Sequence, residues 1–233
     1  MWAVINSIQI ILMVIWTFIC VTCVVLLPVK IQYWVCNNIW APGIFLIFGI
    51  RLKTTGQEHL KETENYIVVG NHTSWGDIIV LFISINNLLR FIAKIELAKL
   101  PLIGIMMKRM GMVFVERGNS QKSAKSVKQT LEKIKGGAKM VGFPEGTRSK
   151  TGKIGQFKKG LIMIAVKAEI DIIPVGLVNV YNVWPRNNFS FRPGKVKANI
   201  GKPISTQGYD ESNINELVEK VKAQVTLLSE QGE

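Results

Sequence analysis

The first 50 residues of this 233-residue chain almost lack charge, because Lys30 is their single charged side chain. All 16 acidic residues and the other basic residues follow from Arg51 onward, and the formal net charge is +13. Apolar residues make up 48% of the chain, which excludes intrinsic disorder. They are too few for the many spans of a polytopic transporter. The basic body suits nucleic acid, an anionic membrane or a phosphorylated substrate, and the apolar leader favours the last two.

Cysteine is absent from residues 51–233, which excludes a disulfide framework and a thiolate metal site there. Cys20, Cys23 and Cys36 all lie in the leader. The spacing Cys20-x-x-Cys23 is found in redox and zinc pairs, but apolar surroundings disfavour the thiolate that both chemistries need. We interpret these cysteines as small apolar residues.

The leader is apolar over a length that suits a membrane. Its uncharged and mostly apolar core, near Ile8–Leu27, has about the 20 residues that span a bilayer as a helix. A signal peptide is disfavoured, because the basic start and the small-residue cleavage site are missing. The second stretch, Ile31–Ile50, is interrupted at Asn37, Asn38 and Pro42-Gly43. A helical hairpin dipping into one leaflet therefore fits as well as two crossings.

The positions of the first cations predict the orientation of the chain. Arg51 and Lys53 directly follow the leader, and Lys and Arg residues collect on the cytoplasmic side of membrane segments. We therefore expect a membrane-associated segment over residues 1–50 and a single domain on the cytoplasmic face over residues 51–233. In a bacterium this would be the inner membrane.

The body alternates short apolar runs with helical patterns, which predicts an α/β fold: a mostly parallel central sheet covered by helices. The expected strands are Tyr66–Gly70, Arg90–Lys94, Met112–Glu116, Ala138–Phe143, Ile172–Val180 and a possible edge strand, Lys195–Ile200. The expected helices are Asp77–Ile85, Glu96–Met110 with an interruption at Pro101, Asn119–Lys135, Phe157–Ala168 and a final amphipathic helix from Ile214 to Leu228.

The first candidate constellation is Asn71-His72-Thr73-Ser74-Trp75-Gly76-Asp77, which follows a strand and opens a helix. A capping box explains part of it, with Ser74 as the N-cap and Asp77 three residues later. It leaves Asn71 and His72 unexplained. The functional alternative makes His72 a general base, since histidine titrates near neutrality, and makes Asp77 the group that orients the imidazole.

The second constellation is Phe143-Pro144-Glu145-Gly146-Thr147-Arg148-Ser149, which also follows a strand. Gly146 permits backbone angles that expose N–H groups to an anion, and Arg148 offers a planar fork for phosphate. A surface turn with a solvated arginine is the alternative. Four lysines that follow within eleven residues of Arg148 favour an anionic ligand or an anionic membrane: Lys150, Lys153, Lys158 and Lys159.

Two further cations stand at strand ends. Lys94 ends one expected strand and Arg117 ends the next. Parallel strands would bring both to the sheet edge that carries His72 and Arg148, which suggests a phosphate site beside a base. The sequence has no nucleophile elbow, P-loop, G-x-G-x-x-G or H-E-x-x-H motif, and no cluster with metal-ligand spacing.

These motifs resemble those of one family. NHTSWGD at residues 71–77 resembles the N-H-x-S-x-x-D block of the 1-acylglycerol-3-phosphate (lysophosphatidic acid) acyltransferases, and FPEGTRS at 143–149 matches another of their blocks. GMVFVER at 111–117 is similar to a strand that closes in arginine, with Glu116 where Asp is common. Ile173-Pro174-Val175 resembles an apolar block around V-P-V, and Ala93–Leu97 a lysine block. The blocks occur in order from residue 71 to 177.

The resemblance implies a reaction. His72, oriented by Asp77, would take the proton from the 2-hydroxyl of lysophosphatidic acid, which attacks the thioester of acyl-CoA or acyl-carrier protein to form phosphatidic acid. Lys94, Arg117 and Arg148 would hold the acceptor's phosphate, and Glu145, Gly146 and Thr147 lie in the block around its glycerol. Pro174 would shape the donor side. The motif residues Asn71, Ser74, Phe143 and Pro144 support the site.

The resemblance implies no metal or other cofactor, no nucleic-acid partner, and membrane lipid as the source of the acceptor. The oligomeric state stays open, as does the choice between CoA and carrier protein. Two alternatives to this function remain. One is an acyltransferase of the same fold that acts on another lysolipid. The other is a non-catalytic membrane protein that binds anionic lipid through its basic face, which would not need a His and an Asp five residues apart.

Overall fold

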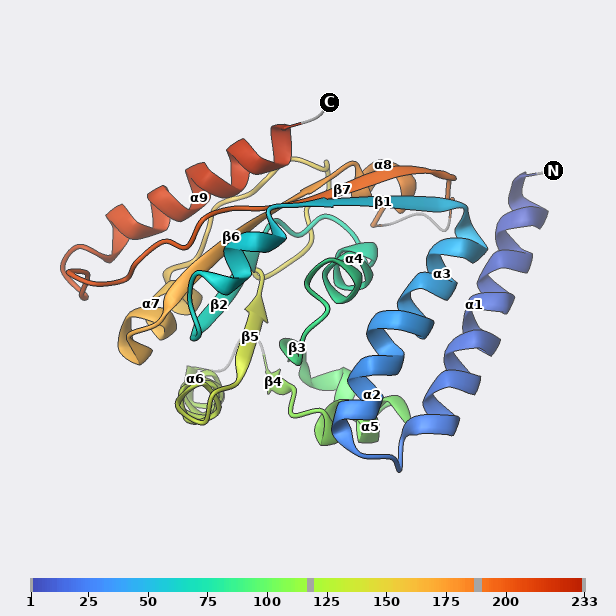
Figure 1. The fold of residues 1–233 in the computed structure, drawn as a ribbon, viewed down its shortest axis with the longest axis horizontal. Helices are drawn as coiled ribbons and strands as arrows, with labels where there is room; N and C mark the ends of the chain where they lie inside the picture. Colours follow the sequence, from blue (N-terminus) through green and yellow to red (C-terminus); the bar gives the residue numbers. More distant parts are fainter. Residues whose placement is uncertain (1, 117–119, 187–189, 232–233) are drawn as a thin grey trace.

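A seven-stranded sheet forms the centre of the molecule (Figure 1). The computed structural model describes residues 2–116, 120–186 and 190–231. The strands lie in the order β1-β7-β6-β2-β5-β3-β4, and every described neighbouring pair is parallel except β6 with β7. The strands are β1 (Ile50–Thr55), β2 (Tyr66–Gly70), β3 (Leu89–Lys94), β4 (Val113–Val115), β5 (Lys139–Gly142), β6 (Asp171–Val178) and β7 (Gly194–Ile200). The expected α/β class is confirmed.

Helices cover both faces of the sheet (Figure 1). One face packs against α4 (Gly76–Ile85) and the helical part of the leader over residues 29–48. The other face packs against α6 (Ser120–Lys135), α7 (Lys159–Ala168) and α9 (Ile214–Glu230). Alternate residues of β2 explain this arrangement, since Tyr66 and Val68 belong to the first core and Ile67 and Val69 to the second. A strand with both faces buried is apolar throughout, which is why β2 could be predicted.

The helical periodicity of the C-terminal segment is also confirmed. Six residues at helical spacing are all buried on one side of α9: Ile214, Leu217, Val218, Val221, Val225 and Leu228. The expected interruption at Pro101 is present too. A 3₁₀ helix over Ile95–Lys99 ends before this proline, and α5 (Ile103–Arg109) begins after it. The proposed cap at Asn119 lies outside the described residues.

The prediction of Lys195–Ile200 as an edge strand is wrong. In the structure this segment is β7, and it lies between β1 and β6. The edge position belongs to β1, a segment that was not predicted as a strand and whose Arg51 and Lys53 were interpreted as the cations that directly follow the leader. The alternation of apolar Ile50 and Leu52 with charged Arg51 and Lys53 was the available signal for a strand with one covered face.

The leader forms a hairpin of two helical arms that pack side by side (Figure 1). The first arm is α1 (Trp2–Val24), and the second runs through α2 (Val29–Val35), a π-helical segment (Cys36–Trp40) and α3 (Ala41–Phe48). The expected break at Pro42-Gly43 does not occur. Pro42 stands in the first turn of α3, where its missing N–H costs no helical hydrogen bond, and the π-helical turn precedes it.

Gly43 and Tyr33 show how the two arms pack together and how the hairpin is attached to the body. A Cβ at Gly43 would overlap the indole of Trp16, so this glycine lets the two arms approach closely. The Trp16 indole donates to the carbonyl of Trp40 at 3.1 Å. Buried Tyr33 lies with its hydroxyl 2.8 Å from the carbonyl of Leu89 and 2.9 Å from that of Met110, which ties the hairpin to the body.

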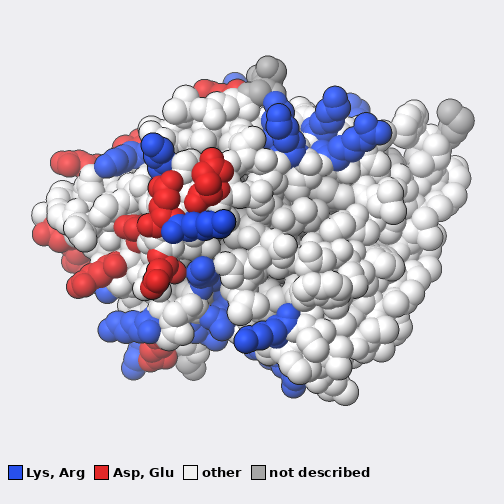
Figure 2. All heavy atoms as spheres, in the orientation of Figure 1, with Lys and Arg blue, Asp and Glu red and all other residues white. Residues whose placement is uncertain are grey.

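The outer face of α1 is apolar and uncovered. In the described part of the chain, α1 is the one helix long and apolar enough to cross a membrane, and few of its residues are buried. Its exposed large apolar side chains are Trp2, Val4, Ile5, Ile8, Ile11, Leu12, Val14, Ile15, Phe18 and Ile19. Figure 2 shows this side of the molecule as a broad uncharged surface beside the charged body. The leader therefore fits association with a membrane.

Candidate active site

The candidate site lies at the carboxyl ends of β2 and β5, which are adjacent parallel strands. The chain leaves β2 at Gly70 and enters α4 at Gly76, and the segment that leaves β5 begins at Phe143. Two backbone contacts join the two loops: the N–H of Ser149 donates to the carbonyl of His72 at 2.7 Å, and the N–H of His72 donates to Glu145 at 2.7 Å. The two predicted constellations thus form one site.

His72 and Asp77 make the expected side-chain contact. Nδ1 of His72 lies 2.8 Å from Oδ2 of Asp77, and the Asp77 side chain is fully buried. The same oxygen accepts the backbone N–H groups of Thr73 at 2.7 Å and Ser74 at 2.8 Å. A carboxylate that accepts from Nδ1 leaves Nε2 of the neutral ring as the acceptor. The geometry suits a general base, and the catalytic role itself stays a prediction.

One of the two hydrogen bonds of the predicted capping box is present. Asp77 accepts the N–H of Ser74, as the box requires, but the Ser74 hydroxyl accepts from Gly76 at 2.9 Å and donates to the carbonyl of Trp184 at 2.6 Å. Asp77 therefore orders the start of α4 and orients His72 with the same carboxylate. The structural and the functional interpretations of this motif are compatible.

Phe143 fixes the plane of the imidazole. Its ring stacks on His72 with the centroids 4.0 Å apart and an interplanar angle of 9°. The side chain of His72 keeps 13% of its surface exposed, so part of it remains accessible to a substrate. With Nδ1 held by Asp77 and one ring face covered by Phe143, the imidazole is preorganised for contact through Nε2.

Glu145 holds backbone groups of two loops. Its carboxylate accepts the N–H of His72 through Oε1 and that of Gly155 through Oε2, the latter at 2.9 Å. Burial raises the pKa of Glu145 above its usual value, and the two backbone hydrogen bonds oppose this shift. Its described contacts are with the backbone, so the predicted contact with the glycerol of a substrate remains a prediction.

The other residues of the second block range from buried Pro144 to exposed Thr147. Gly146 has φ +70°, a left-handed conformation that glycine adopts without strain, and its N–H donates to the carbonyl of Phe143 at 3.0 Å. Thr147 is exposed. The Arg148 guanidinium lies 4.1 Å over the ring of Trp75, a cation–π contact between the two loops. The contact between Trp75 and Arg148 was not predicted, because no local spacing in the sequence indicates it. The carbonyl of Pro144 accepts the N–H of Lys158.

The predicted strand-end cations are partly placed. Lys94 ends β3 at the same sheet edge as His72, where it forms an exposed ion pair with Glu96 at 2.9 Å. Arg117 lies outside the described residues. Pro174 lies buried within β6, in register with Val69, and its carbonyl accepts the N–H of Gly201. Neither the phosphate role of Lys94 nor the donor role of Pro174 follows from these contacts, and both stay predictions.

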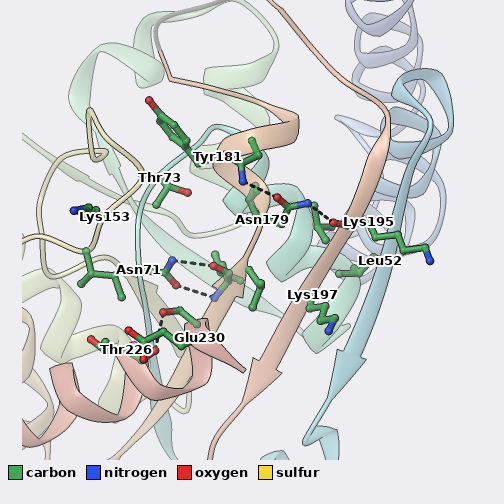
Figure 3. A pocket seen from close by; sticks show the side chains of 18 of the residues that line it. Leu52, Asn71, Thr73, Lys153, Asn179, Tyr181, Lys195, Lys197, Thr226 and Glu230 are labelled. Atoms are coloured by element: carbon green, nitrogen blue, oxygen red, sulfur yellow. Dashed lines mark hydrogen bonds between the residues drawn. The ribbon is translucent and has the colours of Figure 1, made fainter. Parts of the chain in front are cut away.

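Asn71 extends the sheet by its side chain. Its amide donates to the carbonyl of Leu177 at 3.0 Å and accepts the N–H of Leu177 at 2.8 Å, as the dashed lines of Figure 3 show. These bonds continue the pairing of β2 with β6 beyond Gly70. They explain structurally why an amide side chain precedes His72.

Comparison with known proteins places the chain among acyltransferases. A sequence model of the acyltransferase family matches residues 51–178. The chain is 34% identical over 170 residues to the chloroplastic 1-acyl-sn-glycerol-3-phosphate acyltransferase LPAT1 of Arabidopsis thaliana, which covers 72% of this chain and 47% of that protein. It is 30% identical over 208 residues to 1-acyl-sn-glycerol-3-phosphate acyltransferase of Saccharomyces cerevisiae, which covers 88% of this chain and 68% of the relative.

The fold is similar to that of a solved enzyme over its whole length. The crystal structure of the 1-acyl-sn-glycerophosphate (LPA) acyltransferase PlsC from Thermotoga maritima matches with a TM-score of 0.84 and 27% identity, covering 100% of both chains. The chain spans about half the length of the first curated relatives that it matches. The motifs, the fold and these similarities agree, and the chain therefore belongs to the acyltransferase family that includes the 1-acyl-sn-glycerol-3-phosphate acyltransferases.

Proposed function

We propose that this chain transfers an acyl group from a thioester donor to the 2-hydroxyl of 1-acylglycerol-3-phosphate, forming phosphatidic acid for phospholipid biosynthesis. The observation that carries the proposal is the His72–Asp77 pair, held at 2.8 Å at the carboxyl edge of a parallel sheet. Open α/β sheets bind ligands at this edge. The names of the similar acyltransferases and of the solved structure support the same acceptor.

In the proposed reaction, Nε2 of His72 takes the proton from the acceptor's 2-hydroxyl as its oxygen attacks the thioester carbonyl. The new C–O bond forms and the C–S bond breaks. The leaving thiolate takes the proton from the imidazolium and departs as the thiol. Asp77 stabilises the imidazolium through Nδ1. General base catalysis contributes about 10²- to 10⁴-fold, and positioning and oxyanion stabilisation supply the remainder. The scheme uses no metal or other cofactor.

Cations at the sheet edge complete the proposed acceptor site. Arg148, Lys94 and Arg117 would bind the phosphate, and Glu145 and Gly146 would surround the glycerol. Thr147 belongs to the same block and would also contact the substrate. Arg148 is supported by its contact with Trp75, which holds the guanidinium beside the His72 loop. Pro174 would shape the donor side through the position of β6.

We further propose that the uncovered face of α1 holds the body at the bilayer surface, on the cytoplasmic side. The exposed apolar side chains of α1 and the cations that begin at Arg51 support this placement. The lysolipid acceptor resides in the same bilayer, so membrane association brings the site to its substrate.

Purified protein with a panel of lysolipid acceptors, each with acyl-CoA and with acyl-carrier protein, tests the function. We expect lysophosphatidic acid to have the highest kcat/KM and His72→Ala to abolish the transfer without unfolding the protein. Preference for another lysolipid would replace the proposed acceptor, and equal transfer by His72→Ala would overturn the mechanism. No transfer with any acceptor would favour the non-catalytic lipid-binding alternative. Treatment with EDTA tests the cofactor-free scheme, which predicts unchanged activity.

A further inference from the structure

A large cavity opens behind the His72 loop. It has a volume of about 1220 Å³, and its walls come from β1, β7, the end of β6, α8 (Val180–Val183), the loop after β5 and the C-terminal part of α9. Asn71 and Thr73, which flank His72 in sequence, both line it (Figure 3). The cavity therefore adjoins the candidate active site without containing its base.

Cations face one another across two strands of this cavity. In the parallel pairing of β1 with β7, Arg51 is in register with Lys195, and Lys53 is in register with Lys197. Paired strands lie about 4.8 Å apart, so like charges stand directly opposite each other, an arrangement that destabilises a sheet. All four line the cavity, and Figure 3 shows Lys195 and Lys197 along β7.

Three of these cations have no acidic partner among the described residues. Within the described residues, Arg51, Lys53, Lys195 and the nearby Lys153 form no ion pair with an acid. The acid that lines the cavity is Glu230, which lies on α9 across from β7 (Figure 3). The C-terminus of α9 adds about half a negative charge at most. On the face drawn in Figure 2, cations gather over β1 and β7 beside the uncharged hairpin, with no acid among them.

A single cation in this cavity could simply be a solvated surface charge. That explanation suits Lys222, which also lines the cavity and forms an ion pair with Glu219 at 3.9 Å. It does not account for two in-register pairs of cations that line one cavity. A phosphate-bearing ligand accounts for both observations, because it would bridge the opposed cations and its size would suit the volume.

We propose that this cavity is a binding site for phosphate groups, separate from the acceptor cations Lys94 and Arg148. Arg51 and Lys195 are its central contacts, and Lys53, Lys197 and Lys153 complete the positive surface. Two sources offer this chemistry: the 3′-phosphate and pyrophosphate of CoA in solution, and the headgroups of anionic lipids at the bilayer. The CoA source would deepen the proposed function by placing the donor's phosphates beside the His72 loop, and that source alone rests on acyl transfer.

Direct binding to the 233-residue chain tests the site without acyl transfer, in detergent for the soluble ligands and in detergent-free buffer for vesicles. The variant Arg51→Gln/Lys195→Gln is compared with Lys61→Gln/Lys128→Gln, which removes two exposed cations away from the cavity. One arm titrates CoA and inorganic phosphate by calorimetry. The other compares sedimentation with vesicles of phosphatidylcholine alone and of phosphatidylcholine with phosphatidylglycerol, so that the contribution of the apolar hairpin cancels.

We expect the cavity variant, but not its control, to lose at least about 10-fold in affinity for CoA or in preference for the anionic vesicles, and the affected arm identifies the source. Arg51→Glu serves as a second variant, because it can pair with Lys195 across the strands. It should raise the Tm of the ligand-free protein while weakening phosphate binding. Equal affinities of the cavity variant and the control in both arms would overturn the proposal. Loss of binding with normal His72-dependent transfer to lysolipid would leave the proposed function standing.

Discussion

Phe143 lies flat against the imidazole of His72, with the ring centroids 4.0 Å apart and the planes within 9°. The two residues come from different strand ends, and they are brought together by the parallel pairing of β2 with β5. Asp77 fixes the same imidazole through Nδ1. The orientation of the proposed base therefore depends on one contact within its own motif and on one across the sheet.

Replacing Phe143 by Leu tests the contribution of the stacked ring. The substitution keeps apolar bulk but removes the flat surface, so the imidazole can tilt away from the substrate. Small displacements of a catalytic group are costly, and we expect kcat to fall about 10- to 100-fold with a smaller change in KM. Steady-state kinetics and a thermal melt separate this from unfolding. An unchanged kcat would show that Asp77 alone orients His72.

Asp77→Asn tests the orienting carboxylate. Asparagine retains one oxygen that can accept from the same N–H groups, but it carries no negative charge and so cannot stabilise an imidazolium as the carboxylate does. We expect activity to fall by about 10²- to 10⁴-fold while helix α4 still forms. Circular dichroism checks the fold, and transfer assays check the rate. Ser84→Ala, a buried change on the same helix away from His72, is the control that should retain activity.

The raised pKa of Glu145 predicts that this carboxyl group stabilises the folded protein at acidic pH, the opposite of the usual carboxyl group. Burial raises its pKa in the folded protein, so the folded state binds the proton more tightly than the unfolded chain. The stability that this group contributes is fully present below the ordinary glutamate pKa of about 4.3 and is lost as the pH rises through the raised folded pKa.

Thermal melts of wild type and Glu145→Gln across this pH range measure the effect. The difference in Tm between the two proteins should favour wild type most at the acidic end and should shift toward the variant as the pH rises. The glutamine also loses one of the two backbone hydrogen bonds, which adds an offset that does not depend on pH. Parallel Tm curves for the two proteins would show that Glu145 has the same pKa in both states.

Gly43→Ala tests the close approach of the leader's two arms. The added Cβ would overlap the Trp16 indole, and the indole must move from its hydrogen bond to Trp40. Overpacking of this kind costs about 1–3 kcal/mol, and the Tm of the purified protein should fall by several degrees. Gly160→Ala is the matched control, because a Cβ at this helical glycine meets no atom within 4 Å. A Tm equal to that of the control would mean that the arms pack less tightly than described.

The sequence by itself determined the features that depend on nearby residues. Buried parallel strands such as β2 are continuous apolar runs, and the six-residue apolar stripe of α9 follows from helical periodicity. The His72–Asp77 pair was also predictable, because both residues belong to one strand–loop–helix unit and lie five positions apart. The near absence of charge before Arg51 identified the leader.

Tertiary structure alone decided which distant segments meet. Local patterns report burial and backbone conformation but not pairing partners, so neither the insertion of β7 between β1 and β6 nor the stacking of Phe143 on His72 could be derived from them. The hydrogen bonds from the backbone of His72 and Gly155 to the Glu145 carboxylate could not be derived either, because His72 lies far from Glu145 in the chain. The opposed cations Arg51 and Lys195 lie far apart in the chain and become neighbours only through parallel strand pairing. The candidate phosphate site thus forms only in the folded protein, because neither segment alone brings the two cations together.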